Sequence, residues 1–260
     1  MEQFFATYYT PDNAVLSIAG DFDPVEARDL VERYFGPIPR GSGKPPLPLM
    51  DLPPRFGTWL RQVVEDTVMV PRLLLAFRSP TFASEDYYAA NVCAGVIGIG
   101  KGSRLHRALV RERQVASEIG AFTFDLSKGA DLLIADVTAR PEIGADALEH
   151  EVAVEIDLLY RDGVSDIEVQ RAVALIETGF ISAMQSAGDR ADKLSMFATY
   201  FGQPELVNEQ VDRFREVTVA RVGAFIRDQL GADNRASLIY VPRISDANNV
   251  KMTDIVIGGD

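Results

Sequence analysis

The sequence predicts an α+β protein in which a mixed, mostly antiparallel sheet is covered by helices. Short runs rich in aliphatic and β-branched residues at 72–79, 119–124 and 132–139 have the length and composition of strands, and the last two are close enough to form a hairpin. Apolar residues recur at helical spacing over 145–160 and 165–185, and Ser165 followed three positions later by Glu168 is the pattern of a capping box for the second of these helices. These observations together predict one sheet with helices packed against it.

The first 36 residues are predicted to form a helix, a turn, a strand and a second helix. The apolar run 14–19 follows a Pro-Asp-Asn turn and is predicted to be a short strand that ends at Gly20. Asp23 is predicted to cap the second helix, because a proline occupies its first position and an acidic residue follows three positions after the cap.

Residues 37–55 are so rich in proline and glycine that they predict an interdomain linker. Residues 56–245 are predicted to form one complete domain, followed by a tail at 246–260. The elements expected in this domain are strands at 57–64, 72–79, 119–124, 132–139 and 236–241, helices capped near Ser84 and by Ser103, helices over 145–160 and 165–185, and two or three more over 190–230.

The end of the chain repeats its beginning. Phe4 stands eight residues before an Asp-Asn pair at 12–13 and an apolar run, and Phe225 stands eight residues before the same pair at 233–234 and another run. Either these common pieces coincide by chance, or residues 1–20 are the end of an earlier copy of the domain. The second interpretation predicts that the body of the first copy is absent from this chain.

Charge and composition exclude several classes of protein. There are 26 basic and 38 acidic residues, and a net charge of −12 repels phosphate backbones, so nucleic acid is not an expected partner. The single cysteine, Cys93, rules out an internal disulfide. No run reaches the roughly 18 apolar residues of a membrane span. We expect a soluble protein, and its compartment, cytoplasmic or periplasmic, stays open.

Several strings resemble, in order and spacing, the pitrilysin/insulinase family of zinc metallopeptidases. The end of that family's zinc-bearing half is similar to FFATYYTPDNA at 4–14, AGDFD at 19–23 and YFGPIP at 34–39. The start of its second, non-catalytic half is similar to GIGKGSRL at 98–105, LVRE at 109–112 and QVA at 114–116. The resemblance therefore covers the joint between the two halves and most of the second half.

The resemblance implies two homologous α+β halves that close like a clam shell around an unfolded peptide. In this family zinc is held by a His-x-x-Glu-His motif and a distant Glu, all in the first half. The only histidines here are His106 and His150, which cannot form this motif. We therefore expect no catalytic or metal-binding residue in this chain, and zinc in the missing upstream domain or in a partner chain.

Other polar positions have simple structural interpretations. The string 149–151, Glu-His-Glu, is either a fragment of a metal site or, as we prefer, a solvated helix face. His106 is expected to be structural. The resemblance also implies an Arg and a Tyr that assist catalysis from the second half, but the matching positions here are Val110 and Ser117, with Arg111 as a neighbour that could replace the first.

The glycine-rich string at 98–103 is the candidate binding site. Its counterpart in a mitochondrial processing relative of the family is implicated in substrate binding, which implies peptide contact by Gly98, Gly100, Lys101, Gly102 and Ser103. A phosphate cradle is a weaker interpretation, because the lysine is followed by glycine and not by Ser or Thr. A plain turn between two helices is the structural alternative.

The leading hypothesis is that this chain is the substrate-enclosing, non-catalytic C-terminal part of a zinc-dependent metalloendopeptidase. One alternative is a zinc-free pseudo-peptidase subunit that pairs with a zinc-bearing partner, and another is an interaction module unrelated to proteolysis. Cys93 is expected to be a buried thiol, and Trp59 a packing residue in a strand. The residues do not identify the substrate or the cleavage preference.

Overall fold

The computed structural model describes residues 1–243 except 42, 44, 46–51, 83 and 125–130. The strands in this part are β1 (Trp59–Asp66), β2 (Arg72–Ser79), β3 (Ala116–Thr123), β4 (Asp131–Ala139) and β5 (Arg235–Pro242). They form one sheet in the order β1-β5-β2-β4-β3. β1 and β5 are parallel and all other neighbours are antiparallel, which confirms the predicted mixed, mostly antiparallel sheet.

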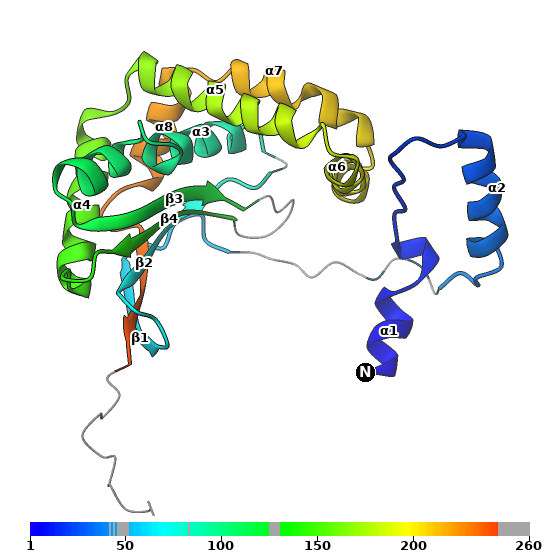
Figure 1. Ribbon diagram of the computed structural model, residues 1–260, viewed down its shortest axis with the longest axis horizontal. Coiled ribbons are helices and arrows are strands. Elements are labelled where there is room, and N and C mark those ends of the chain that lie inside the picture. The colour runs from blue at the N-terminus through cyan, green and yellow to red at the C-terminus, as the bar shows by residue number, and fades with distance from the viewer. Residues whose placement is uncertain (42, 44, 46–51, 83, 125–130, 244–260) are drawn as a thin grey trace, which may run out of the picture.

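Helices follow β2 and β4 and form layers on the sheet (Figure 1). They are α3 (Tyr87–Gly98), α4 (Ala145–Asp162), α5 (Asp166–Ala183), α6 (Ala187–Phe201), α7 (Gln210–Arg215) and α8 (Val219–Gln229), with a π-helical segment η2 (His106–Glu112) and a 3-10 segment η3 (Pro204–Glu209). α3 contacts β3 and β4 on one side and α5 on the other. No helix of the described part is long and apolar enough to cross a bilayer.

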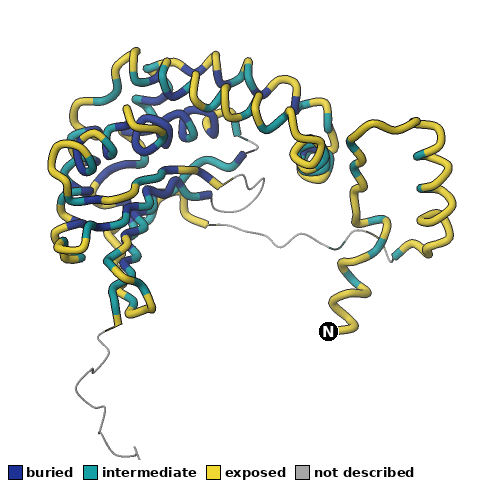
Figure 2. Tube along the Cα trace, in the orientation of Figure 1, coloured by how far each residue is buried: buried dark blue, intermediate teal, exposed yellow. Residues whose placement is uncertain are grey.

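The core lies between the sheet and α3. Alternate residues of β2, such as Leu73 and Phe77, are fully buried because successive side chains of a strand point to opposite faces. α3 is buried on nearly all sides, including Val92 and Val96, since it lies between the sheet and α5. Figure 2 shows this concentration of buried residues in α3 and the sheet. Each such side chain contributes about 1.5–3 kcal/mol on burial.

The predicted capping of two helices is confirmed. Asp23 precedes α2 (Pro24–Phe35), and its Oδ1 accepts hydrogen bonds from the N–H groups of Val25 at 2.7 Å and Glu26 at 3.1 Å. Ser165 precedes α5 and forms the reciprocal capping box with Glu168.

The strand predicted at 14–19 is not formed. After α1 (Glu2–Tyr8) and the 3-10 turn η1 (Pro11–Asn13) the chain is extended, with φ −123° and ψ 148° at Ala14, but it pairs with no described strand. An extended segment becomes a strand only when a neighbour satisfies its N–H and C=O groups. The apolar run at 14–19 has the local conformation of a strand without a sheet to join.

The cap predicted at Ser103 is also wrong. The Ser103 hydroxyl is fully buried and has no hydrogen-bond partner, and the following segment forms the π-helical η2 instead of a capped α-helix. The backbone explains the difference. Ser103 N–H donates to the carbonyl of Gly100 at 3.1 Å, so Ser103 closes a tight turn and its side chain lies in the interior.

The N-terminal segment stands apart from the sheet (Figure 1). Its turn at Asp12 is tied to the start of the predicted linker, because the two Asp12 carboxylate oxygens accept the N–H groups of Gly41 at 3.0 Å and Gly43 at 3.1 Å. The pKa of Asp12 is lowered, most by the neighbouring Thr10 side chain and to a lesser degree by these backbone bonds. The tail predicted at 246–260 lies outside the described residues.

Candidate functional site

The glycine-rich string begins where α3 meets the backbone of β3. A Cβ atom on Gly98 would lie 2.6 Å from the Ala121 nitrogen and 2.8 Å from the Gly120 carbonyl carbon, both of them backbone atoms. Only glycine therefore lets the end of α3 approach the strand this closely. Gly98 is buried, and its role is to position the turn that follows.

The turn itself is formed by residues 99–103. Ile99 N–H bonds the Gly95 carbonyl at 3.2 Å and so ends α3, and Gly100 then adopts φ +75°, a conformation that side chains disfavour. Gly100, Lys101 and Gly102 are exposed, whereas Ser103 is buried. Of the five predicted binding residues, three lie on the surface, while Gly98 and Ser103 hold the turn from inside.

Two arginines hold this turn against α5. Arg104 forms a forked ion pair with Glu168, with Nε to Oε1 at 2.6 Å and Nη2 to Oε2 at 2.9 Å, and it also donates to the Gly163 carbonyl at 2.7 Å. Arg171 donates from Nη1 to the carbonyl of Gly102. Hydrogen bonds and an ion pair therefore join the exposed turn to α5. Sequence reasoning missed both arginines, because their partners lie some 60 positions away or more.

The Arg104–Glu168 pair predicts a dependence of stability on pH. Burial would raise the pKa of Glu168, but hydrogen bonds from Arg104 and Ser165 outweigh it and lower that pKa to about 2. Because the folded pKa lies below the ordinary value of 4.5, the stabilisation is complete above pH 4.5 and is lost as the pH falls toward 2. Glu168→Gln should therefore cost about 1–2 kcal/mol at pH 7 and progressively less below pH 4.

This prediction is checked by urea unfolding of both proteins between pH 7 and pH 2.5. Glu142→Gln serves as the control, since that carboxylate is exposed on the segment before α4. A difference between wild type and Glu168→Gln that stays constant over the whole pH range would contradict the assigned ion pair.

The turn lies next to an edge strand. β3 is at the end of the sheet order and, in the described part of the chain, pairs only with β4. The bond from Phe124 N–H to the Leu132 carbonyl sets the alternation of the ladder, so the N–H and C=O groups of Ile119, Ala121 and Thr123 point away from β4. An outward row of backbone donors and acceptors can pair with an added extended chain.

Two aromatic side chains lie at the C-terminal end of β3. Phe122 and Phe124 are both exposed, and their ring centroids lie 5.7 Å apart in an edge-to-face arrangement. Exposed aromatic pairs of this kind bury apolar surface when a partner covers them. The edge of β3 thus offers backbone hydrogen bonds and apolar contact area together.

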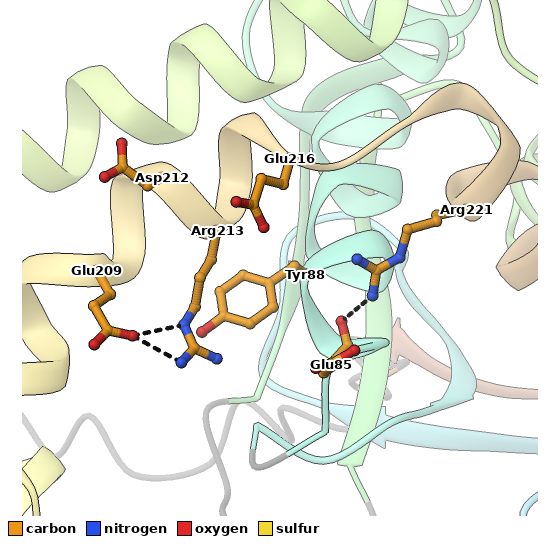
Figure 3. Close-up of a pocket in the computed structure, with 7 residues that line it drawn as sticks. All are labelled: Glu85, Tyr88, Glu209, Asp212, Arg213, Glu216 and Arg221. Atoms are coloured by element: carbon orange, nitrogen blue, oxygen red, sulfur yellow. Dashed lines mark hydrogen bonds and ion pairs between the residues drawn. The ribbon is translucent and has the colours of Figure 1, made fainter.

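A hollow of about 410 Å³ elsewhere on the molecule is lined mainly by charged side chains (Figure 3). It lies between the start of α3 and the α7–α8 region, and both of its arginines have partners among the lining residues. Arg213 pairs with Glu209 at 2.8 Å and lies 5.9 Å from the Tyr88 ring centre, and Arg221 donates to the Glu85 carbonyl at 2.7 Å. Burial raises the pKa of the Tyr88 phenol, which donates to Gln210. These pairings describe a structural network.

The described residues contain no group of three His, Cys, Asp or Glu side chains placed to hold a metal ion. His150 is exposed on α4, as expected. Glu149 differs from the expectation of a solvated face, because it is buried and pairs with Arg61 of β1 at 2.7 Å. Glu151 pairs with Arg113 at 2.8 Å.

The two positions that match the family's catalytic helpers do not provide free donors. Val110 is apolar, and the Ser117 hydroxyl donates to the Ala139 carbonyl of the neighbouring strand at 3.1 Å. Arg111 is exposed on η2 beside Val110. Cys93 is fully buried in α3, and burial raises the pKa of its thiol, which agrees with the predicted inert thiol.

Comparison with known proteins decides the family. The family model described as the peptidase M16 inactive domain matches residues 1–176. The chain belongs to this family. It is therefore an inactive-domain relative of zinc proteases, which confirms the non-catalytic assignment that the sequence resemblance predicted.

Individual relatives support the same conclusion. The zinc protease PqqE of Helicobacter pylori is 26% identical over 208 residues, which cover 79% of this chain and 46% of that protein. A solved protease from Helicobacter pylori has a similar fold, with a TM-score of 0.82 and 20% identity over 93% of this chain and 58% of that one. A peptidase M16 inactive domain from Pseudomonas fluorescens gives a TM-score of 0.70 and 18% identity, covering 87% and 52% of the two chains. The chain spans about half the length of these relatives.

Proposed function

We propose that this chain is the substrate-enclosing, non-catalytic half of a zinc metalloendopeptidase, and that its glycine-rich turn contacts the bound peptide. The observation that carries the proposal is the position of the exposed turn, Gly100 to Gly102, which follows directly after the contact of Gly98 with the edge strand β3. An extended peptide is the ligand whose backbone can pair with a strand edge. Glycines next to that edge let its backbone come close.

Zinc and the catalytic groups belong, in this proposal, to a preceding half, of which residues 1–36 are the end, or to a partner chain. Residues 37–55 then join the two halves, and 56–245 are the inactive domain. Relatives about twice as long that are named zinc proteases support this division. The described residues do not form a zinc site, so no step of the reaction is assigned to them.

A proteolysis assay tests the proposal. The chain is combined with a zinc-bearing half, on one polypeptide or as two, and hydrolysis of fluorescently labelled unfolded casein is followed. We expect hydrolysis by the combination and none by this chain alone. Lys101→Glu, at the exposed tip of the turn, should raise KM for casein about threefold or more and leave kcat and Tm unchanged.

Arg227→Glu is the matched control, because it makes the same charge reversal at an exposed position on α8. An unchanged KM for Lys101→Glu, or an equal change for both variants, would contradict peptide contact by the turn. A combination that cleaves no peptide at all would favour an interaction module unrelated to proteolysis.

A second arrangement is favoured by one relative. The beta subunit of the mitochondrial-processing peptidase of Saccharomyces cerevisiae is 23% identical over 82% of this chain. Because this relative is named as one subunit of a peptidase, it supports the alternative in which this chain is a zinc-free pseudo-peptidase subunit that pairs with a separate zinc-bearing chain. Co-purification from the native source distinguishes the arrangements, since one long polypeptide or two shorter ones would be recovered.

A further inference from the structure

A second hollow, of about 400 Å³, lies where α3, α5, α6 and α7 meet. Its lining includes the buried aromatic side chains of Phe82, Tyr87, Phe197 and Phe214. Ligand pockets in proteins have volumes of about 300–1,000 Å³ and are lined mostly by apolar and aromatic side chains. The hollow therefore has the size and the lining of a binding site.

Two polar side chains on the wall of this hollow already have partners. Gln210 Oε1 accepts the hydroxyl of Tyr88 at 3.0 Å, and Gln210 Nε2 donates to a backbone carbonyl of η3 at 2.8 Å. Asn91 Nδ2 donates to the Tyr87 hydroxyl at 3.1 Å and to Thr123 Oγ1 at 2.8 Å. A polar occupant would lose its hydration and would have to compete for these groups. The hollow therefore favours an apolar occupant.

Gly179 enlarges the hollow from the side of α5. It lies inside this helix and on the wall of the hollow. A Cβ atom on Gly179 would meet no described atom within 4 Å, so no close contact requires a glycine there. Glycine is also less favourable inside a helix than every residue except proline. Helix stability does not explain Gly179, whereas the need for space in the hollow does.

One end of the hollow adjoins the glycine-rich turn. Ile99, which ends α3 directly before Gly100, lines the hollow together with Leu175 of α5. A Cβ atom on Gly100 would lie 3.2 Å from Leu175 Cδ1, and the Leu175 side chain is exposed. A peptide in contact with the turn would therefore meet apolar side chains that lead into the hollow.

The edge strand β3 adjoins the hollow as well. Thr123, at the end of β3, bonds Asn91 on the wall, and Ala121 contacts the end of α3 at Gly98. These strand residues face the helices. Alternate side chains of an extended chain added to β3 would point to the same helix-covered face. The hollow lies on this face, within the path of such a chain.

We propose that the hollow binds one large apolar side chain, such as phenylalanine or leucine, of an extended peptide that lies along the β3 edge and the glycine-rich turn. In this arrangement Ile99 and Leu175 form the entrance, and the absence of a side chain at Gly179 provides the room. The inference rests on the proposed function and adds to it a preference for peptides with an apolar anchor residue.

Two peptides that differ in one residue test this preference. Both are uncharged decapeptides of Ser, Thr and Gln with the same terminal fluorescent label, and one has phenylalanine where the other has serine at the centre. Fluorescence anisotropy titration with the full chain should give a Kd about tenfold lower, or more, for the phenylalanine peptide. Equal affinity for the two peptides would overturn the proposal.

Gly179→Leu fills the hollow without a backbone clash. It should raise the Kd of the phenylalanine peptide about tenfold and leave that of the serine peptide unchanged, while the Tm should not fall because leucine favours the helix. Ser182→Leu is the matched control, because it adds the same side chain at an exposed position of α5 outside the lining of the hollow. An equal loss in both variants, or none in Gly179→Leu, would contradict occupation of the hollow.

Photo-crosslinking locates the anchor residue. With benzoylphenylalanine in place of phenylalanine, the peptide should form adducts within residues 175–197, mapped by mass spectrometry. Adducts confined to other segments, or no binding of either peptide at millimolar concentration, would overturn the inference.

These measurements do not depend on hydrolysis, so the two proposals can fail separately. Hydrolysis of casein together with equal affinity for the two peptides would remove only the apolar anchor site. Binding of the phenylalanine peptide without any hydrolysis by the combined halves would support the anchor site and contradict the peptidase assignment.

Discussion

Replacement of Gly98 by alanine is expected to destabilise the protein by about 3 kcal/mol or more. The added methyl group would lie 2.6 Å from the Ala121 nitrogen and 2.8 Å from the Gly120 carbonyl carbon. Both atoms belong to the sheet backbone, so α3 would have to move away from β3 and open the core. Thermal unfolding should show a Tm lower by about 6–12 °C for a chain of this size.

Gly179→Ala is the matched control. Gly179 lies within α5, and a Cβ atom there would meet no atom within 4 Å. The same substitution should raise stability by about 0.5–1 kcal/mol, because alanine restricts the unfolded chain and favours the helix. A Gly98→Ala protein with a Tm within about 2 °C of wild type would show that α3 and β3 are not in close contact.

Replacement of Asn234 should have the second-largest effect on stability. The fully buried Asn234 amide accepts the N–H of Phe56 and donates to the backbone carbonyl and the side chain of Gln229, the latter at 3.1 Å. Asn234→Ala removes these bonds and leaves the backbone groups of Phe56 and Gln229 without their partner. We expect a loss of about 2–4 kcal/mol in urea unfolding.

Asn13→Ala provides the comparison within the same chain. Asn13 makes the equivalent bond to Tyr8, but it is exposed, so water replaces the lost partner. The change should cost less than about 0.5 kcal/mol in this chain. Equal losses for the two variants would mean that burial and the bond to Phe56 contribute nothing to the stabilisation by Asn234.

The candidate site was only partly accessible from sequence. The sequence alone shows three closely spaced glycines and a lysine at 98–103. The structure places three residues of this string on the surface, near the edge strand β3. Their separate roles were not visible. Gly98 is required by a strand that begins 18 positions later, and Gly102 is held by Arg171 of α5. Contacts between distant segments leave no local pattern.

The incorrect expectations have the same origin. The run 14–19 has strand composition, yet composition does not supply a neighbouring strand. Ser103 has the side chain of a cap, but the turn closed by Gly100 directs it inward. Glu149 is buried because Arg61 of β1 meets it at 2.7 Å. In each case a preference of the local sequence was overridden by packing.

The amino-acid order alone determined the periodicities, the caps at Asp23 and Ser165, the mixed sheet with its hairpin and the likeness to the non-catalytic half of a peptidase. These features depend on residues within a few positions of one another, or on short strings that resemble those of a family. Only the tertiary structure decided that β5 is central, that β3 is an edge and that Gly98 touches a strand. Such facts arise from the pairing of remote segments, where shape, burial and hydrogen bonding act across the whole fold.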